Sequence, residues 1–265
     1  MSEPETNGVA MLKVRNLRRS FAGVHAVDGL DFEVRRGSIT GVIGPNGCGK
    51  TTSVNCITGF DPRYSGEVEL EGRSIAHMGA DSVARTGVMR TFQAIRVFDD
   101  YSVLQNALIG HQSFDGLAWW DPVIRTRKFR DTEEASRDKA RSLLKAVGLG
   151  AKLDHSAGTL SYGQKKLLAL ATTLMSDPQL VILDEPVAGV NPTLTGEIAE
   201  VLRGLNRSGA SFLIIEHNIQ FIMELCDEVI VMDRGRRLTS GAPSIIQRDP
   251  RVIEAYLGGN AHAHG

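Results

Sequence analysis

The stretch Gly44-Pro45-Asn46-Gly47-Cys48-Gly49-Lys50-Thr51-Thr52 is the most informative part of the sequence, because it fits the phosphate-binding pattern G-x-x-x-x-G-K-[ST]. Residues 38–43 before it are predicted to form a short buried strand, and residues 51–58 the first turns of a helix. The glycines let successive backbone N–H groups converge on an anion, to which the helix N-terminus adds its dipole. We therefore expect a nucleotide-phosphate site in which Lys50 contacts the β- and γ-phosphates and the Thr51 hydroxyl binds Mg²⁺. A glycine-rich turn before an ordinary helix is the alternative.

The composition is that of a globular protein with ample material for a core. The chain has 265 residues, of which 42% are hydrophobic and 23% charged, and its net charge of −1 gives no bulk basic character that favours a nucleic-acid partner. Apolar runs such as 167–170 and 180–183 are far shorter than the roughly 18 residues of a membrane span. No apolar region follows Met1, so neither secretion nor membrane insertion is expected. The three cysteines have no metal spacing, which is typical of a reducing cytosol.

Alternating apolar residues predict strands over 12–17 and 30–34 in the first part of the chain. Phe21 lies between them and is a candidate for stacking on a nucleotide base, an interaction worth about 1–3 kcal/mol where it occurs. A core phenylalanine is the alternative, and the residues alone leave both open. Further strands are predicted over 67–70 and over 87–93, the second ending at the polar Gln93.

The pattern from there to about Lys165 is helical. Residues 131–134 (Asp-Thr-Glu-Glu) resemble a capped helix start, and Gly148 is expected to end that helix. Trp119 and Trp120 lie near several arginines and a lysine, so contact with membrane or nucleic acid competes there with packing inside a helical subdomain. Next, Ser161 and Gln164 form a capping-box pair at the start of a helix over 165–175, whose N-terminus offers free N–H groups to an anion.

Two carboxylates follow a strongly apolar strand at 179–183. In an enzyme that hydrolyses a nucleotide, one such acid holds Mg²⁺ and another orients or deprotonates water. We expect Asp184 to hold the metal and Glu185 to act on water, and the pleat of a regular strand would point them to opposite sides.

His217 follows another apolar strand, 211–215, as part of Glu216-His217-Asn218. A lone histidine there is usually only a satisfied polar residue. Parallel α/β sheets, however, bind ligands at the carboxyl ends of their strands, so Gly44, Gln93, Asp184 and His217 are expected to face one nucleotide. A short helix over 218–226 and a strand pair over 228–232 and 236–240 should follow. His262 and His264 in the tail could bind a metal weakly, but a disordered end is the preferred interpretation.

Taken in order, these residues resemble those of the ATP-binding cassette (ABC) ATPases over almost the whole chain. The resemblance implies an α/β fold: a P-loop NTPase (RecA-like) core with an antiparallel β subdomain and an inserted α-helical subdomain. It also implies a flexible N-terminus (1–10), an ABC ATP-binding domain (11–257) with the helical subdomain at about 94–165, and a flexible tail (258–265). It rests on the phosphate loop and on Phe21, Gln93, the signature Leu160-Ser161-Tyr162-Gly163-Gln164, residues 181–185 and His217.

Within the family, four stretches resemble the larger ATP-binding subunit of Liv-type importers of branched-chain amino acids. Two residues depart from the general family pattern: Tyr162 replaces the usual signature glycine, and Asn191 stands where most members carry aspartate. Both are similar to the Liv-type branch, and they leave open whether both composite sites of a dimer are equally active. The stretches are Arg90-Thr91-Phe92-Gln93, the long segment before the signature, residues 188–192 and residues 253–258.

The resemblance implies an ATPase that converts ATP and water to ADP and phosphate and powers uptake of branched-chain or related amino acids through ATP-driven dimer closure. Implied partners are two membrane permease subunits, a second ABC ATPase subunit (a paralogue or a second copy) and, indirectly, an extracytoplasmic solute-binding protein; no nucleic acid is implied. The implied location is the cytoplasmic face of the inner (plasma) membrane, as a peripheral subunit, with residues 93 to about 106 against a permease helix. The resemblance also implies roles for single residues. The implied catalytic residues are Glu185, His217, Lys50 and Gln93, and the implied Mg²⁺ ligands are Thr51, Gln93 and Asp184. The implied nucleotide-binding residues are Phe21, Gly44, Pro45, Asn46, Gly47, Cys48, Gly49, Lys50, Thr51 and Thr52, with Ser161, Gly163 and Gln164 acting from the opposing subunit.

Other functions compete with this interpretation. A cytosolic ABC ATPase of DNA repair or translation would carry a long coiled coil or two cassettes in tandem, and this sequence has neither. A small-molecule kinase or a GTPase would lack the signature, and no Asn-Lys-x-Asp motif for guanine is present. Urea or amide import and lipopolysaccharide export remain open, because membrane and external subunits select the substrate.

Overall fold

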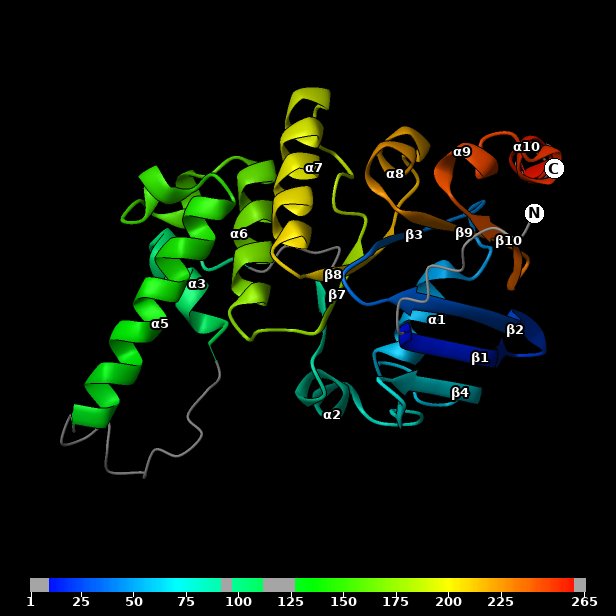
Figure 1. Ribbon diagram of the computed structural model, residues 1–265, viewed down its shortest axis with the longest axis horizontal. Coiled ribbons are helices and arrows are strands. Elements are labelled where there is room, and N and C mark those ends of the chain that lie inside the picture. Colours follow the sequence, from blue (N-terminus) through cyan, green and yellow to red (C-terminus); the bar gives the residue numbers. More distant parts are fainter. Residues whose placement is uncertain (1–9, 92–96, 112–126, 260–265) are drawn as a thin grey trace, which may run out of the picture. The chain divides into compact units, whose positions relative to one another are not determined.

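The computed structural model describes residues 10–91, 97–111 and 127–259. These residues form two compact units, which we describe separately. The sheet unit comprises the described residues within 1–90, 179–188 and 206–265, and the helical unit those within 91–178 and 189–205. Figure 1 shows both units in sequence colours. The expected division into an N-terminus, a domain with an inserted helical subdomain and a tail stays a prediction.

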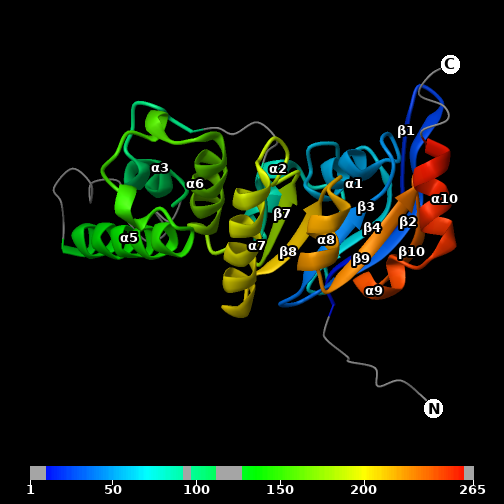
Figure 2. The same cartoon turned by 90° about the horizontal axis from the view of Figure 1, so that it is seen from above.

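A six-stranded sheet with the order β10-β9-β3-β8-β7-β6 forms the centre of the sheet unit. β3, β7 and β8 are short runs of apolar residues that are buried over their whole length, which is typical of strands covered on both faces. β3 pairs in parallel with β8 and β9, and β7 pairs in parallel with β8, so their carboxyl ends share one edge (Figure 2). The strands are β3 (Ile39–Ile43), β6 (Val88–Thr91), β7 (Leu180–Asp184), β8 (Ser211–Ile215), β9 (Glu228–Asp233) and β10 (Arg236–Gly241).

A second, antiparallel sheet has the order β2-β1-β4-β5. Its first two strands are much longer than the predicted 12–17 and 30–34, because the ladder between them continues through register shifts. Alternate residues of this ladder point into a core that also takes side chains from the six-stranded sheet and from α1 (Lys50–Ile57). The strands are β1 (Ala10–Phe21), β2 (Val24–Arg35), β4 (Ser65–Leu70) and β5 (Arg73–Ser74).

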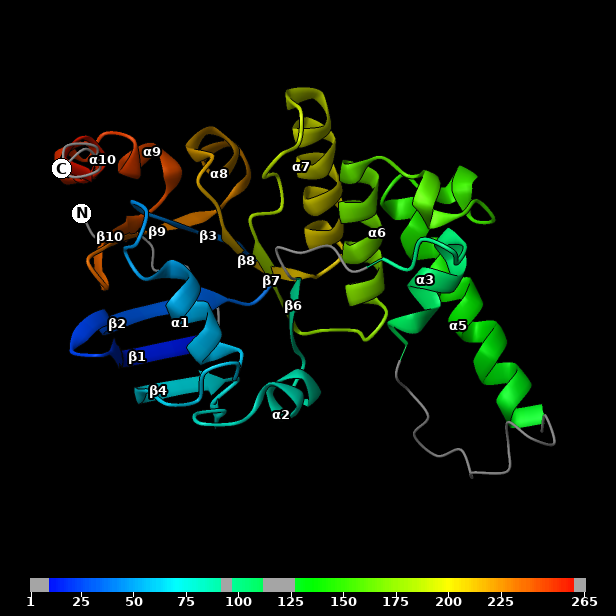
Figure 3. The same cartoon turned by 180° about the vertical axis from the view of Figure 1, so that it is seen from behind.

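Helices and short 3-10 turns build the helical unit, in which α3, α5 and α6 pack on one another (Figure 3). The predicted helix start at 131–134 is wrong, because α5 already begins at Arg127 and these residues lie inside it. Residues 127–130 contain good helix formers and no glycine or proline, so nothing stops the helix from extending upstream. Gly148, with φ of 76°, follows its end as predicted. The elements are α3 (Val103–Ile109), α5 (Arg127–Ala146), η1 (Gly150–Lys152), η2 (Ala157–Thr159), α6 (Tyr162–Leu174) and most of α7 (Pro192–Arg207).

Besides α1, the described part of the sheet unit contains the helices α2 (Ala80–Arg85), α8 (Ile219–Leu225), α9 (Pro243–Ile246) and α10 (Pro250–Gly259). α8 begins as the sequence predicts, with the Asn218 side chain accepting the N–H of Phe221. The predicted antiparallel pair at the end of the sheet is confirmed as β9 and β10. Among the described residues, no helix has both the length and the apolar character of a membrane span.

Candidate functional site

The phosphate loop leaves the buried end of β3 and runs into α1, as predicted. Gly49 occupies the helix N-cap with φ of 100°, a conformation that costs glycine little and other residues much more. A Cβ at Gly49 would also collide with the carbonyl oxygen of Ala26, and one at Gly44 with that of Met232. These glycines are therefore required for both conformation and space, which makes the backbone groups of the loop available to a ligand.

Lys50 is the first residue of α1, and its side chain folds back over the loop. Its Nζ donates hydrogen bonds to the carbonyl oxygens of Gly44 at 2.7 Å and Pro45 at 3.0 Å, and only 5% of the residue is exposed. The Cys48 sulfur lies 3.7 Å from the same nitrogen. Burial raises the pKa of the Cys48 thiol above its ordinary value, although Lys50 opposes the shift. The Lys50 ammonium is thus held by the carbonyl oxygens of the loop in which the sequence pattern predicts a phosphate.

Asp184 is the last residue of β7 and is 6% exposed. The strand does not continue to Glu185, whose φ is +52°, so a left-handed turn rather than the pleat of a regular strand separates the two acids. The N–H of Glu185 donates to the Ile215 carbonyl at 2.9 Å, which fixes this turn against the end of β8. The regular pleat expected to continue through Glu185 is therefore absent, and the separate roles of the two acids stay a prediction.

His217 lies in the loop after β8, where its Nε2 is 2.9 Å from Oε1 of Glu185. The imidazole side chain is 45% exposed, so His217 is not buried in the core, and its role at the nucleotide stays a prediction. The structure thus brings together the side chains that follow β7 and β8, 32 residues apart in the sequence.

Glu216 supports this pair, although the sequence reasoning gave it no role. It is 2% exposed, and its two oxygens accept the N–H groups of Val187 at 2.8 Å, His217 at 2.9 Å and Asn218 at 3.2 Å. A carboxylate with three backbone donors connects the loop after β7 to the loop after β8. Its only signal in the sequence is an acid directly after the apolar residues 212–215.

A second pair of residues that the sequence reasoning did not assign lies beside Asp184. The guanidinium of Arg90, on β6, donates to the Asp184 carboxylate at 2.5 Å and to the Asn55 side chain at 2.6 Å. Asn55 belongs to α1, so the Arg90 guanidinium connects β6 and β7 to the helix that follows the phosphate loop. In the sequence, Arg90 is marked only as part of the stretch Arg90-Thr91-Phe92-Gln93.

The oxygen groups near the loop fit a small divalent cation in their chemistry. Asp184 offers a carboxylate oxygen and Thr51, exposed on the first turn of α1, a hydroxyl, and Mg²⁺ prefers such hard oxygen ligands. No cluster of three or more His, Cys, Asp or Glu side chains suited to a metal occurs among the described residues, so any bound Mg²⁺ would depend on water and phosphate oxygens as well. The third predicted ligand, Gln93, lies outside the described residues, as do Trp119, Trp120, His262 and His264.

Phe21 ends β1 and is 46% exposed, so the alternative of a core phenylalanine is wrong. The Arg19 guanidinium lies over the ring at 4.2 Å from its centroid, and Asp61 holds that guanidinium at 2.7 Å. The ring is therefore fixed on one face while part of its surface remains accessible. Its role in stacking on a base stays a prediction.

The signature residues lie in the helical unit, at the start of α6. The predicted capping box is present: Ser161 Oγ accepts the N–H of Gln164, and Gln164 Oε1 accepts the N–H of Ser161. A Cβ at Gly163 would collide with the Leu194 side chain, which explains the glycine. Tyr162 is 52% exposed, and the Lys166 ammonium lies 5.4 Å from its ring centroid. The oxygen of the Gln164 side chain is thus used in capping α6, and the Tyr162 ring is exposed at the same helix start.

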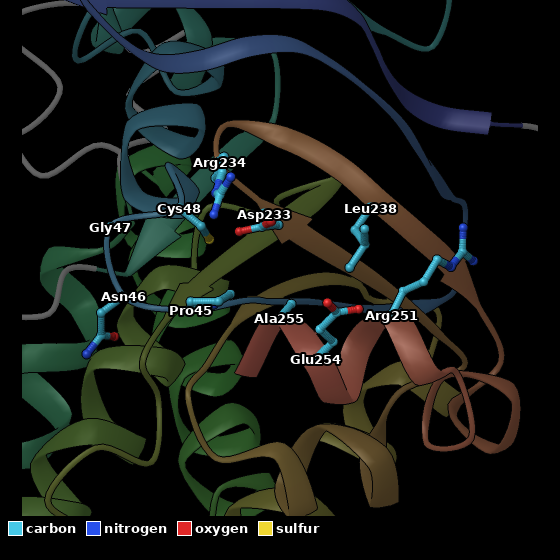
Figure 4. Close-up of a pocket in the computed structure, with 10 residues that line it drawn as sticks. All are labelled: Pro45, Asn46, Gly47, Cys48, Asp233, Arg234, Leu238, Arg251, Glu254 and Ala255. Atoms are coloured by element: carbon cyan, nitrogen blue, oxygen red, sulfur yellow. The ribbon is translucent and has the colours of Figure 1, made fainter. Parts of the chain in front are cut away.

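A cavity of about 540 Å³ opens beside the phosphate loop. Residues Pro45 to Cys48 form one wall, the turn between β9 and β10 another, and α10 a third (Figure 4). Figure 4 shows Asp233 and Arg234 next to Cys48, while Glu254 and Ala255 face the cavity from α10. Next along α10, burial raises the pKa of Tyr256 to about 12. The C-terminal helix therefore packs close to the outer side of the loop.

Two family models match this chain. The model described as "ABC transporter" matches residues 27–188, which include the phosphate loop, the signature and both acids, Asp184 and Glu185, at the end of β7. The model described as "Branched-chain amino acid ATP-binding cassette transporter" matches residues 236–262, a range that includes β10, α9 and α10. The second match therefore covers the segment whose helix borders the cavity.

Curated relatives match over nearly the full length. The chain is 35% identical to the high-affinity branched-chain amino acid transport ATP-binding protein LivG of Salmonella typhimurium, over 97% of this chain and 99% of that protein. It is also 35% identical to the corresponding protein BraF of Pseudomonas aeruginosa, over 94% of this chain and 98% of that protein. A crystal structure of an ATP-binding cassette of an ABC transporter in its ADP conformation aligns with a TM-score of 0.81 and 33% identity, covering 94% and 99% of the two chains.

Proposed function

This chain belongs to the ABC transporter family of ATP-binding subunits, and on that premise we propose that it hydrolyses ATP to power the uptake of branched-chain or related amino acids. The observation that carries the proposal is the Glu185–His217 contact at the sheet edge from which the phosphate loop also leaves. Relatives with branched-chain amino acid transport in their names support the choice of substrate class.

The phosphate loop binds the nucleotide in this proposal. Lys50 exchanges the carbonyl oxygens of Gly44 and Pro45 for the β- and γ-phosphates, while the backbone N–H groups of the glycine-rich loop surround the phosphate chain. Phe21 stacks on the base. Mg²⁺, held by Thr51, Asp184 and Gln93, would neutralise phosphate charge when bound.

Glu185 acts as the general base that takes a proton from the attacking water. His217 contacts the γ-phosphate, and its hydrogen bond to Glu185 keeps the two side chains in one orientation before the nucleotide arrives. Glu216 holds the two loops that carry them through three backbone N–H groups. Preorganisation of this kind lowers the reorganisation that the reaction requires.

A second ATPase subunit completes the site in this proposal. Ser161, Gly163 and the rest of the signature contact ATP bound to the opposing subunit, so that ATP joins two subunits and its hydrolysis releases them. The exposed Tyr162 ring at the start of α6 supports a role of this surface in contact with another molecule. The second subunit is either a paralogue or another copy of this chain.

The permease subunits dock on the helical unit, beside the segment that follows Gln93. Phe98 and Tyr101 are 56% and 49% exposed, and their rings stack with centroids 5.6 Å apart. The side chain of buried Asn106 forms hydrogen bonds with the backbone of Phe98 and Ser102, which fixes the backbone that carries the aromatic pair. An exposed aromatic pair of this kind can pack against a helix of the permease. In this proposal the docked subunit lies at the cytoplasmic face of the membrane.

The test is to purify this subunit from native membranes with its permease partners and to measure ATP hydrolysis in proteoliposomes. Leucine, isoleucine and valine, delivered with the solute-binding protein, should stimulate hydrolysis. If only urea or short amides stimulate hydrolysis, the proposed substrate class is wrong and the proposed ATPase activity still holds. Absence of any ATP hydrolysis by the assembled complex would remove the enzymatic role.

A further inference from the structure

Arg90 makes the most buried ion pair among the residues that the structure describes. Its side chain is 9% exposed and that of Asp184 5%, whereas the next most buried pair, Arg19–Asp61, has 13% on both sides. The Phe60 ring lies 5.8 Å from the Arg90 guanidinium carbon and covers it further. Buried ion pairs contribute little net stability, because desolvation offsets their attraction. Stability alone is therefore a poor explanation for this arginine.

The two ends of the Arg90 guanidinium contact different elements. Nη2 donates to Oδ2 of Asp184 at the end of β7, and Nη1 donates to Oδ1 of Asn55 on α1. Asn55 follows Thr51 by four residues, so both lie on the same face of α1. One planar group thus relates the carboxylate of Asp184 to the helix face that carries the Thr51 hydroxyl. These are the two described oxygen groups that the proposed function assigns to the divalent cation.

One polar atom of each residue in the Arg90–Asp184 pair makes no hydrogen bond to the described residues. Oδ1 of Asp184 accepts no hydrogen bond from the described residues, and the buried Nε of Arg90 has no acceptor among them. The carboxylate is therefore held by one oxygen, while the other stays available to a cation or to its water. Carboxylates that bind metals are oriented by partners of this kind, whose loss lowers metal affinity.

We propose that Arg90 is a positioning residue that orients Asp184 for the divalent cation of the bound nucleotide and fixes its place relative to Thr51. This inference rests on the proposed function. It assigns to Arg90 no contact with ATP, so its loss affects the binding of the cation and leaves the affinity for metal-free nucleotide unchanged.

The experiment measures Mn²⁺ binding to the full chain by electron paramagnetic resonance, in the presence of a saturating non-hydrolysable ATP analogue. Arg90→Gln should weaken Mn²⁺ binding by about 10–100-fold, the usual effect of removing such a partner. Its affinity for the analogue in EDTA should equal that of the wild type. Arg90→Lys should recover part of the Mn²⁺ affinity, because it keeps the charge and loses the planar fork that reaches both partners.

A matched control separates positioning from general loss of an ion pair. Arg35 donates to Glu228 at 3.0 Å near the opposite edge of the six-stranded sheet, so Arg35→Gln should leave Mn²⁺ binding unchanged. Asn55→Ala keeps the ion pair but frees the guanidinium from α1, and it should weaken Mn²⁺ binding less than Arg90→Gln. This variant decides the matter if Arg90→Gln does not fold.

Mn²⁺ affinity in folded Arg90→Gln that equals or exceeds that of the wild type overturns the inference, because the arginine would then be neutral or would compete with the cation. Unchanged Mn²⁺ affinity in Asn55→Ala overturns the link to α1, and with it the inference, if Arg90→Gln cannot be studied. Wild-type protein that binds neither analogue nor Mn²⁺ would instead remove the proposed function itself.

Discussion

His217 Nε2 lies 2.9 Å from Glu185 Oε1, and the two residues follow adjacent parallel strands of the same sheet. Glu185 sits in a left-handed turn and His217 is held by Glu216, so the contact depends on the conformation of both loops. A carboxylate next to an imidazole at the edge of a parallel sheet suits a base and a phosphate contact that act together.

Glu185→Gln should bind ATP and hydrolyse it about 10²–10⁴-fold more slowly, because glutamine keeps the shape of the side chain and loses the base. The ATP-bound dimer should accumulate, which size-exclusion chromatography with ATP would detect. Glu33→Gln, an exposed position on β2, is the control and should hydrolyse ATP normally. A rate close to that of the wild type in Glu185→Gln would contradict the role of general base.

His217→Ala should reduce hydrolysis by about 10²-fold with only a small loss of ATP affinity, as expected for a lost contact to the charge that develops on phosphate. The side chain is half exposed, so the thermal unfolding midpoint should not change. Single-turnover kinetics and a thermal melt on the same sample measure both quantities. A variant that loses stability and keeps its hydrolysis rate would show that the histidine is structural.

Lys50→Ala should weaken ATP binding by about 10–100-fold, since a hydrogen bond from a charged group contributes about 1.5–3 kcal/mol. The lysine is buried within the loop, where its Nζ donates to the carbonyl oxygens of Gly44 and Pro45 and lies 3.7 Å from the Cys48 sulfur; among the described residues no carboxylate pairs with it. Binding of a fluorescent ATP analogue measures the effect. Lys145→Ala, an exposed position on α5, serves as the control; equal affinities of the two variants would rule out the phosphate contact.

Phe98→Ala should weaken assembly with the permease subunits and leave ATP binding by the isolated subunit unchanged. An exposed aromatic anchor at an interface contributes about 2 kcal/mol or more, which corresponds to roughly 30-fold in affinity. Co-purification from membranes measures assembly. Ile245→Ala removes an apolar side chain of similar exposure on α9 and should assemble normally. Normal assembly of Phe98→Ala would place the permease elsewhere.

Alkylation of Cys48 should be slow at neutral pH and become faster as the pH rises. Burial raises the pKa of this thiol, so the reactive thiolate is scarcer than for a free cysteine at any pH below the pKa. Burial also raises the pKa of Cys56, to about 12, so Cys56 should react more slowly still. Mass spectrometry of iodoacetamide-treated peptides, with and without ATP, measures both sites. Protection of Cys48 by ATP is expected; equal labelling with and without ATP would place the nucleotide away from this thiol.

Several parts of the fold could be predicted from the sequence because they depend on neighbouring residues. The strand at 211–215, the helix after Asn218 and the Ser161–Gln164 capping box were each indicated within a few residues, and each is present. The start of α5 was not found, since Arg127 to Arg130 carry no cap or breaker signal and the acidic cluster at 131–134 imitated one. Local patterns thus located most elements and placed their ends less reliably.

Residue order alone predicts the phosphate loop, the two acids Asp184 and Glu185 and the family, because each is carried by particular residue types at a fixed spacing. Which side chains meet depends on the tertiary structure. Arg90 contacts Asp184 across 94 positions, Glu216 joins two loops through backbone groups, and Glu185 leaves its strand through a positive φ. Each depends on strand pairing that brings distant segments together, and no local pattern records such contacts.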